Sequence, residues 1–274
     1  MSSDLFCDLD QLAAALPDAA SIAVPADSYG VAMAATRALV RRGVRGLRLV
    51  CVPTSGIQAD VLIGAGCAAA IETSAVALGE YGAAPRFAAA VRDGSLRILD
   101  ATCSAIHAGL QAGQKGLPFM PARGILGSDL LAHRTDWKVI DNPFAPGEPV
   151  VAVGAITPDF ALFHAPCADR RGNVLVGRSR DLLTMAQASR ASLITVEELV
   201  EGDLLADRER SPGVIPALYV TRIAVAPRGA WPLGLAGRYE ADLAALERYA
   251  RAARTAEGFR AWLDEWLARE PAAV

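Results

Sequence analysis

The 274-residue sequence has no run of about 18 uninterrupted apolar residues, the length that a membrane-spanning helix needs. It is also poor in lysine, because Lys115 and Lys138 are the only two, and its arginines are scattered and form no basic stripe. With a formal net charge of −3, the sequence predicts no nucleic-acid partner and no membrane partner. Its first residues, MSSDLFCDLD, are acidic where a signal peptide would be basic, so we expect a cytoplasmic protein.

Metal-binding and redox motifs are missing as well. The cysteines are odd in number and lack C-x-x-C spacing, which excludes a strong zinc or redox motif and fits reduced thiols in a cytoplasm. The histidines are not spaced as metal ligands, so we expect ordinary core or surface histidines. The sequence predicts no metal and no permanently bound cofactor. The cysteines are Cys7, Cys51, Cys67, Cys103 and Cys167, and the histidines are His107, His133 and His164.

What is present is a globular composition, with 53% hydrophobic and 21% charged residues. The length suits one large domain or two small ones, and no linker-like segment divides it, so we expect a single domain over residues 1–274. Short apolar runs alternate with longer helical patterns, which is typical of parallel sheets covered by helices. The expected fold is α/β, an open and mostly parallel sheet with helices on both faces.

Apolar periodicity, glycine and proline give the expected elements. The expected strands cover residues 21–24, 47–52, 69–71, 96–99, 150–156, 160–164, 192–197 and 217–226. The expected helices cover residues 30–42, 58–63, 85–91, 103–116, 185–190 and 240–268, the last a long amphipathic C-terminal helix with Gly258 as a possible break. Residues 227–237 are expected to be loop.

The most informative segment is 91–129. A strand-like run ends at Asp100, a helical run begins near Cys103 and stops at Gly116, and a loop punctuated by proline and glycine follows. Amides point outward at a helix start, and the helix dipole favours negative charge there. This order of strand, helix start and glycine-rich loop is the usual geometry of an α/β active site.

Two other segments combine glycine with polar residues. The string HAPCADRRGNV, which begins at His164, places Asp169 and Asn173 in a turn after a strand, and turn chemistry alone explains it as a structural hairpin. Gly64 and Gly66 form a short G-x-G, for which tight packing and ligand binding are both ordinary explanations.

Several ordered motifs resemble the α subunits of family I CoA-transferases, and among these the A subunits of glutaconate CoA-transferases. They are an AG..GLP run at residues 112–118, a GLPF.P.R...GSD block at 116–129, AD..GN at 168–173, ITVEELV at 194–200, PGVIP at 212–216 and P.GA.P at 227–232. The resemblance covers roughly residues 60–240. It implies a CoA-transferase-like fold and the A subunit of a heteromeric acyl-CoA:carboxylate CoA-transferase, with a CoA thioester and a small carboxylic acid as substrates.

In that family CoA moves between acids through a glutamyl-CoA thioester, and the nucleophilic glutamate belongs to the β subunit in a Ser-Glu-Asn-Gly-like motif. No such motif occurs in this chain, and Glu197-Glu198 lies within the ITVEELV strand pattern. The resemblance therefore implies half an enzyme, which shapes the acyl pocket and stabilises the oxyanion beside a partner's glutamate. We expect a β-subunit partner, in a heterodimer or heterotetramer, and an inactive chain without it.

The same resemblance suggests the site residues. Thr102, Cys103 and Ser104 would form the catalytic oxyanion and acyl pocket, and the start of their helix is expected to converge with Ser74 and with the Gly64 to Gly66 loop. The substrate-binding candidates are Gly64, Gly66, Thr73, Ser74, Gly116, Phe119, Arg123, Gly127 and Ser128.

Two of these residues carry alternatives. Cys103 stands where many α subunits have a glutamine, and a cysteine is a weak hydrogen-bond donor. It is either a nucleophile at a helix start or a small buried side chain whose neighbours donate instead. Arg123 either pairs with the distal end of a dicarboxylate or forms a salt bridge to Asp129.

Two other functions stay open. The first is an acyl-CoA or ring-opening hydrolase of the same architecture, in which water replaces the acceptor acid. The second is a non-catalytic ligand-binding homologue. An isolated A subunit should also present an apolar surface near residues 116–129, where a partner would dock.

Overall fold

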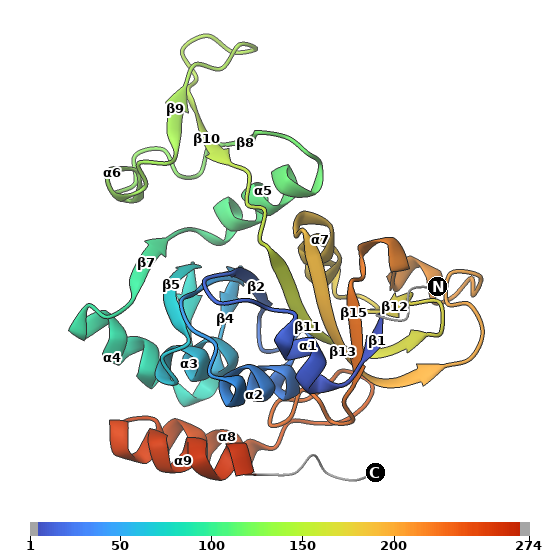
Figure 1. The fold of residues 1–274 in the computed structure, drawn as a ribbon. Helices are drawn as coiled ribbons and strands as arrows, with labels where there is room; N and C mark the ends of the chain where they lie inside the picture. Colours follow the sequence, from blue (N-terminus) through green and yellow to red (C-terminus); the bar gives the residue numbers. More distant parts are fainter. Residues whose placement is uncertain (1–4, 269–274) are drawn as a thin grey trace.

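The computed structural model describes residues 5–268, and its centre is a ten-stranded sheet (Figure 1). Every neighbouring pair along the main path is parallel, and antiparallel pairing is confined to β12 (Val174–Leu175) and β14 (Val214–Ile215) at its margin. The expected open, mostly parallel sheet is confirmed. In spatial order the path runs through β1 (Phe6–Cys7), β15 (Arg222–Val225), β13 (Ala191–Val200), β11 (Phe160–Asp169), β2 (Ser21–Pro25), β3 (Leu47–Val52), β5 (Ala68–Thr73) and β7 (Arg97–Asp100).

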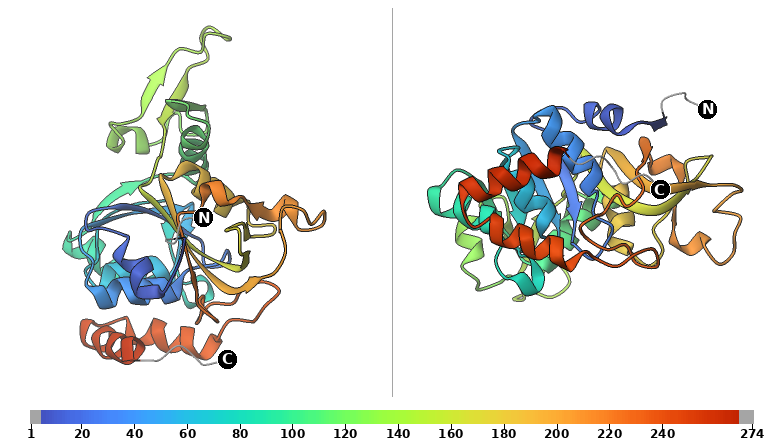
Figure 2. Two further views of the ribbon diagram at one scale, coloured as in Figure 1. Left: turned by 45° about the vertical axis from the view of Figure 1, so that its right-hand side comes forward. Right: turned by 90° about the horizontal axis from the view of Figure 1, so that it is seen from below.

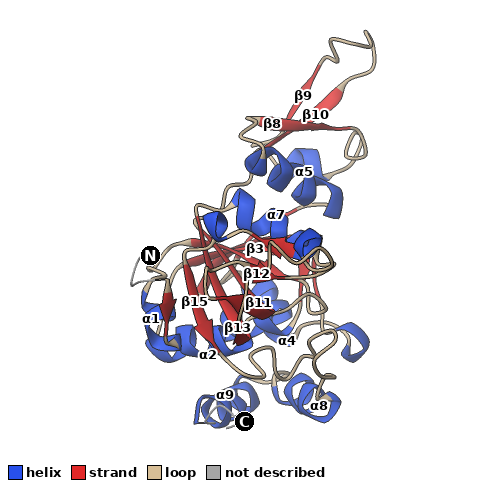
Figure 3. Ribbon diagram, turned by 90° about the vertical axis from the view of Figure 1, so that its right-hand side faces the viewer, coloured by secondary structure: helices blue, strands red, loops and turns tan. Residues whose placement is uncertain are grey.

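Helices cover both faces of this sheet (Figures 1 and 3). In β2, Ile22 and Val24 pack into one buried cluster and Ala23 into the other, because successive strand side chains point to opposite faces. The first cluster lies against α1 (Leu9–Ala14), α2 (Met33–Arg42), α3 (Ile57–Gly64) and α4 (Pro85–Asp93). The second lies against α5 (Cys103–Gln114) and α7 (Arg180–Ala188).

A small antiparallel sheet protrudes from the body beyond α5 (Figure 1 and the left view of Figure 2). It consists of β8 (Phe119–Ala122), β10 (Val150–Gly154) and β9 (Lys138–Ile140), with the short helix α6 (Leu130–His133) at its side. The strand expected at residues 150–156 is therefore real but belongs to this second sheet. Residues 116–149 contain β8, α6 and β9, which the sequence pattern did not predict.

The strand expected over residues 217–226 is wrong in its first half. Residues Ala217–Tyr219 form a 3-10 turn, η3, and β15 begins only at Arg222. The turn follows Pro216, and its first amide donates to the side-chain oxygen of Asn173, 3.0 Å away. A long-range hydrogen bond thus overrides the local strand pattern.

The C-terminal helix is divided in two. Helices α8 (Leu243–Ala252) and α9 (Ala256–Ala268) form an outer layer beneath α2 and α3 (Figures 1 and 2). The expected single helix over 240–268 breaks at residues 253–255, where the Thr255 hydroxyl accepts a hydrogen bond from the Gly258 amide at 3.0 Å. A Cβ on Gly258 would lie 2.5 Å from the Ala252 carbonyl oxygen, so this glycine allows the close turn.

Candidate active site at the carboxyl edge of the sheet

The loops after β3, β5 and β7 meet at one edge of the sheet, because neighbouring parallel strands all end there. Ser74, which follows β5, donates from its hydroxyl to the Pro53 carbonyl at 2.9 Å. Its oxygen also lies 3.1 Å from the Cys103 sulfur at the start of α5. Ser74 thus contacts both Pro53, 21 positions earlier in the sequence, and Cys103, 29 positions later. These contacts lie at the edge where ligands bind in open α/β sheets.

The start of α5 is a cluster of donors. Thr102 caps the helix, with its hydroxyl oxygen accepting from the Ala105 amide at 3.1 Å, and it lies 3.0 Å from the Ser104 hydroxyl. The first amides of a helix have no partner within it, and no acidic residue neutralises the first turn of α5. This arrangement suits an oxygen that gains negative charge, as the carbonyl of a thioester does on nucleophilic attack.

Cys103 is exposed, so the interpretation of this residue as a small buried side chain is wrong. Since the Ser74 hydroxyl gives its proton to the Pro53 carbonyl, the contact between Ser74 and Cys103 is made by the thiol proton. The thiol is thereby oriented, and its sulfur stays open to solvent at the mouth of the site.

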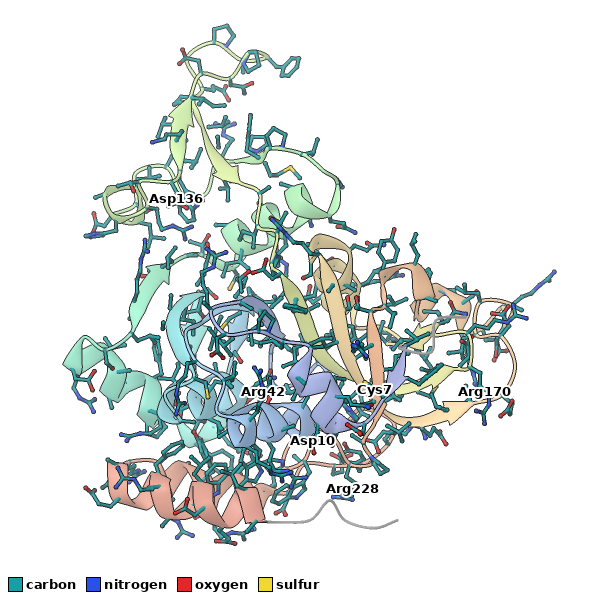
Figure 4. The ribbon with its side chains drawn as sticks, viewed as in Figure 1. Cys7, Asp10, Arg42, Asp136, Arg170 and Arg228 are labelled. Carbon is teal, nitrogen blue, oxygen red and sulfur yellow. The ribbon has the colours of Figure 1, made fainter. Side chains whose placement is uncertain are left out.

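Arg134 is a buried neighbour of the site that the sequence motifs did not indicate. Its guanidinium is only 5% exposed and donates to Glu72 at 2.7 Å, to Asp136 at 2.8 Å and to the Asp100 carbonyl at 3.1 Å. Glu72 is thus a structural acceptor. Asp136 lies at the foot of the protruding sheet, so the arginine fastens that sheet to the ends of β5 and β7 (Figure 4). A lone Arg in an irregular segment gives no sequence signal for this role.

Gly64 and Gly66 do not converge with this edge. They precede β5, whereas Ser74 follows it, and a six-residue strand separates the two ends by about 20 Å. The expected common pocket with Thr102 to Ser104 is therefore wrong. A Cβ on Gly64 would lie 2.6 Å from the Phe259 ring and 2.7 Å from the Arg86 side chain, so tight packing explains this glycine.

The remaining substrate-binding candidates occupy several places. Thr73 is buried and is engaged locally with Ala75, donating to its carbonyl at 2.8 Å. Arg123 forms an exposed ion pair with Glu148 at 2.8 Å, so the alternative of a salt bridge to Asp129 is wrong. The others lie between α5 and α6: Gly116 and Gly127 at positive φ, Phe119 partly exposed in β8, and Ser128, which donates to the Ile125 carbonyl.

The later motifs form structural networks. Asp169 accepts from the Asn173 side chain at 2.8 Å and from two backbone amides of the β11–β12 hairpin, which confirms the hairpin interpretation. His164 is fully buried and contacts Thr195 at 2.8 Å and Glu197 at 2.6 Å. Burial opposes ionisation of Glu197, but hydrogen bonds from His164, the Arg228 amide and Tyr239 outweigh it and lower its pKa.

Metal-binding groups and membrane-spanning helices were both searched for in the described part of the chain. Across residues 5–268, His, Cys, Asp and Glu form no group of three or more that is arranged to hold a metal ion. No helix within the same range is both long and apolar enough to cross a bilayer.

Fold and site together define an α/β protein that gathers polar side chains and a helix start at the carboxyl edge of its parallel sheet. Residues 7–225 match the Coenzyme A transferase family. The chain is 33% identical over 254 residues to the A subunit of 3-oxoadipate CoA-transferase from Pseudomonas knackmussii, covering 91% of this chain and 88% of the relative. It is 31% identical over 226 residues to the A subunit of glutaconate CoA-transferase from Acidaminococcus fermentans, covering 76% and 70%. This chain therefore belongs to the Coenzyme A transferase family.

Solved structures agree with this assignment. The crystal structure of glutaconate coenzyme A-transferase from A. fermentans matches with a TM-score of 0.88 at 28% identity, covering 96% of this chain and 88% of that one. The structure of a decarboxylase AibA/AibB variant matches with a TM-score of 0.86 at 31% identity, covering 98% and 100%. The CoA-transferase-like fold expected from the sequence motifs is confirmed.

Proposed function

We propose that this chain is the A (α) subunit of a heteromeric acyl-CoA:carboxylate CoA-transferase, acting in the cytoplasm. Its substrates are a CoA thioester and a small carboxylic acid, and no cofactor is permanently bound. The observation that carries the proposal is that Ser74 meets the first turn of α5, with its amides and its residues Thr102, Cys103 and Ser104, at the carboxyl edge of the sheet. Relatives that cover most of the chain are the A subunits of CoA-transferases, which supports a B (β) partner.

This chain supplies binding and oxyanion stabilisation, and the partner supplies the nucleophile. Glu72, the glutamate nearest to Ser74 in the sequence, is held in a buried ion pair with Arg134 and is not free to attack a thioester. A glutamate of the partner would attack the carbonyl beside Cys103, and the negative charge that develops on the carbonyl oxygen would face the α5 amides. Donors fixed by the fold stabilise this charge without reorganisation.

Partner dependence tests this proposal. The purified chain alone should neither transfer CoA nor hydrolyse thioesters at enzymatic rates, and co-expression with the product of the neighbouring gene should restore transfer. Hydroxylamine or borohydride treatment of the complex with acyl-CoA should then trap a thioester on a glutamate of the partner. Robust turnover by the lone chain would refute the half-enzyme proposal and make Cys103 the candidate nucleophile.

A hydrolase of the same architecture is the second candidate. Cys103 motivates it, because a thiol stands where the transferase resemblance leads us to expect a glutamine. The assay that separates the two omits the acceptor acid. A transferase complex should then release free CoA slowly, whereas a hydrolase should release it at the same rate with and without the acid.

A further inference from the structure

An open cavity of about 510 Å³ lies beside the candidate site, between the loops after β2, β3 and β5 and helix α8. Its wall includes residues of the short ladder of β4 (Thr54–Ser55) and β6 (Ala75–Val76), two strands that begin directly after Pro53 and Ser74. The cavity therefore begins one residue away from the contact between Ser74 and Cys103. Its volume falls within the range of small-molecule sites, which is about 300–1,000 Å³.

The lining of this cavity is mainly apolar. Its largest aliphatic side chains are Leu78 from the loop after β6, Leu233 from the loop before α8, and Leu243 and Leu246 from α8 itself. Leu243 is 58% exposed, so apolar surface faces water at this cavity. An apolar occupant that covers this surface would be stabilised by the hydrophobic effect.

The charged residues of the lining are all acidic. Among residues 5–268, no arginine, lysine or histidine lines the cavity, whereas Glu80 is exposed at its rim and Asp27 forms part of its wall. Burial raises the pKa of Asp27 to about 6, so at neutral pH this carboxylate is mostly ionised. A ligand carboxylate in the cavity would meet two like charges and no counter-ion from this chain. Arg123, the residue expected to hold a dicarboxylate, is instead paired with Glu148.

We propose that this cavity binds the acyl chain of the CoA thioester and selects uncharged, apolar chains over chains that end in a carboxylate. The inference rests on the proposed function, because it takes the Ser74–Cys103 edge as the place of the thioester carbonyl. From that edge the chain would pass along the β4–β6 ladder toward Leu243 and Leu246 of α8. The apolar wall and its acidic charges then set the substrate class together.

Binding of two matched amides to the full chain tests the cavity without catalysis. Hexanamide and the monoamide of adipic acid have carbon chains of equal length, and they differ at the far end, which is a methyl group in one and a carboxylate in the other. At neutral pH, titration calorimetry should detect binding of hexanamide. The monoamide should bind at least about tenfold more weakly, because its carboxylate would leave water without gaining a partner.

Ala77 offers a substitution that fills the cavity. It lines the cavity and is exposed, so Ala77→Leu adds bulk there without entering the core. Hexanamide binding should then weaken at least about tenfold, the usual effect of overpacking. The matched control is Ala83→Leu, which should leave binding unchanged, because Ala83 is the exposed β-bridge partner of Ala77 and lies outside the cavity lining.

The co-expressed complex tests the link to substrate choice. From butanoyl-CoA to hexanoyl-CoA, kcat/KM should rise about fourfold per methylene, the gain that burial of one methylene gives. The value for glutaryl-CoA should lie at least about tenfold below that for pentanoyl-CoA, whose acyl chain has the same number of carbons. Leu243→Arg places a cation at the cavity and should raise the ratio of glutaryl-CoA over pentanoyl-CoA at least about tenfold. The uncharged control Leu243→Gln should change this ratio far less.

The outcomes separate the two proposals. An active complex that prefers glutaryl-CoA, or a chain to which hexanamide does not bind, would overturn the cavity proposal and leave the proposed function intact. Hexanamide binding that Ala77→Leu abolishes, in a complex without transferase activity, would support the cavity's ligand class and reject the proposed function.

Discussion

At the scale of single residues, Cys103 has a defined environment. Its sulfur is exposed and lies 3.1 Å from the Ser74 oxygen, so the thiol is fixed at the mouth of the site by one hydrogen bond. A serine at this position keeps a donor of nearly the same size, whereas a leucine removes the donor and fills the space in front of Ser74.

Substitutions of Cys103 therefore separate the effect of its hydrogen-bond donor from the effect of side-chain size. In the complex with its partner, Cys103→Ser should leave kcat/KM within a few-fold of the parent value. Cys103→Leu should raise the KM for acyl-CoA about tenfold or more, since overpacking costs about 1–3 kcal/mol. The control is Gln111→Leu, an exposed position further along α5, which should leave KM unchanged. Loss of all activity in Cys103→Ser would instead identify the thiol as a nucleophile.

Asp60 provides a prediction about pH. Burial raises its pKa from 3.8 to about 6, although it accepts hydrogen bonds from Tyr249 at 2.6 Å and from the Phe87 amide at 2.7 Å. A raised carboxyl pKa means that the folded state binds the proton more tightly than the unfolded state. Its stabilising contribution is therefore complete below about pH 4 and is lost as the pH rises through about 6.

Asp60→Asn cannot ionise and should not show this loss. Relative to the parent chain, its free energy of unfolding should rise by up to about 3 kcal/mol between pH 4 and pH 7, as urea titrations at each pH would measure. The control is Asp93→Asn at an exposed helix end, which should show no such gain. A constant difference between Asp60→Asn and the parent across this range would contradict the burial argument.

At the scale of elements, the contact between α3 and α9 explains Gly64. The last residue of α3 faces the ring of Phe259, which is 4% exposed, and no side chain fits between them. Gly64→Ala should therefore destabilise the chain by about 1–3 kcal/mol through overpacking. The measurement is a thermal or urea midpoint, and kcat/KM of the complex well below that midpoint should be unchanged.

The matched control for this substitution is Gly154→Ala in β10, where no atom lies within 4 Å of an added Cβ and stability should be preserved. An unchanged midpoint in Gly64→Ala combined with a large rise in KM would restore the substrate-binding role that the G-x-G motif suggests.

At the scale of the whole molecule, the protruding sheet carries exposed apolar side chains. Phe144 is 94% exposed and Val139 54% exposed, and Leu117 and Phe119 are also exposed nearby in the chain. Isolated exposed hydrophobic residues are common, but several on one projecting element mark an interaction surface. Leu117 and Phe119 belong to residues 116–129, where the partner is expected to dock.

Phe144→Asp should therefore weaken association with the co-expressed partner at least about tenfold, since hot-spot residues contribute about 2 kcal/mol or more. Affinity pull-down and analytical ultracentrifugation would measure the effect. Leu218→Asp is the control, because Leu218 is 85% exposed in η3 on the main body and should not disturb the complex. Retained assembly in Phe144→Asp and disrupted assembly in Leu218→Asp would place the interface elsewhere.

The sequence by itself determined the elements whose signals are local. Proline begins α4 at Pro85, Gly43 ends α2 in a left-handed conformation, and mostly apolar runs mark β2 and β3, because these preferences act within a few residues. The α5 start near Cys103 followed from the same rules.

Only the tertiary structure decided which local features share a site. Ser74 meets Cys103 because the parallel strands β5 and β7 end at the same edge of the sheet, whereas Gly64 lies at the other end of β5. A short sequence motif does not indicate at which edge of the sheet its residues will lie. The cavity between α8 and the loops after β2, β3 and β5 is likewise lined by segments more than 160 residues apart in the sequence. Such contacts depend on the free energy of the whole packed chain, so no window of the sequence contains them.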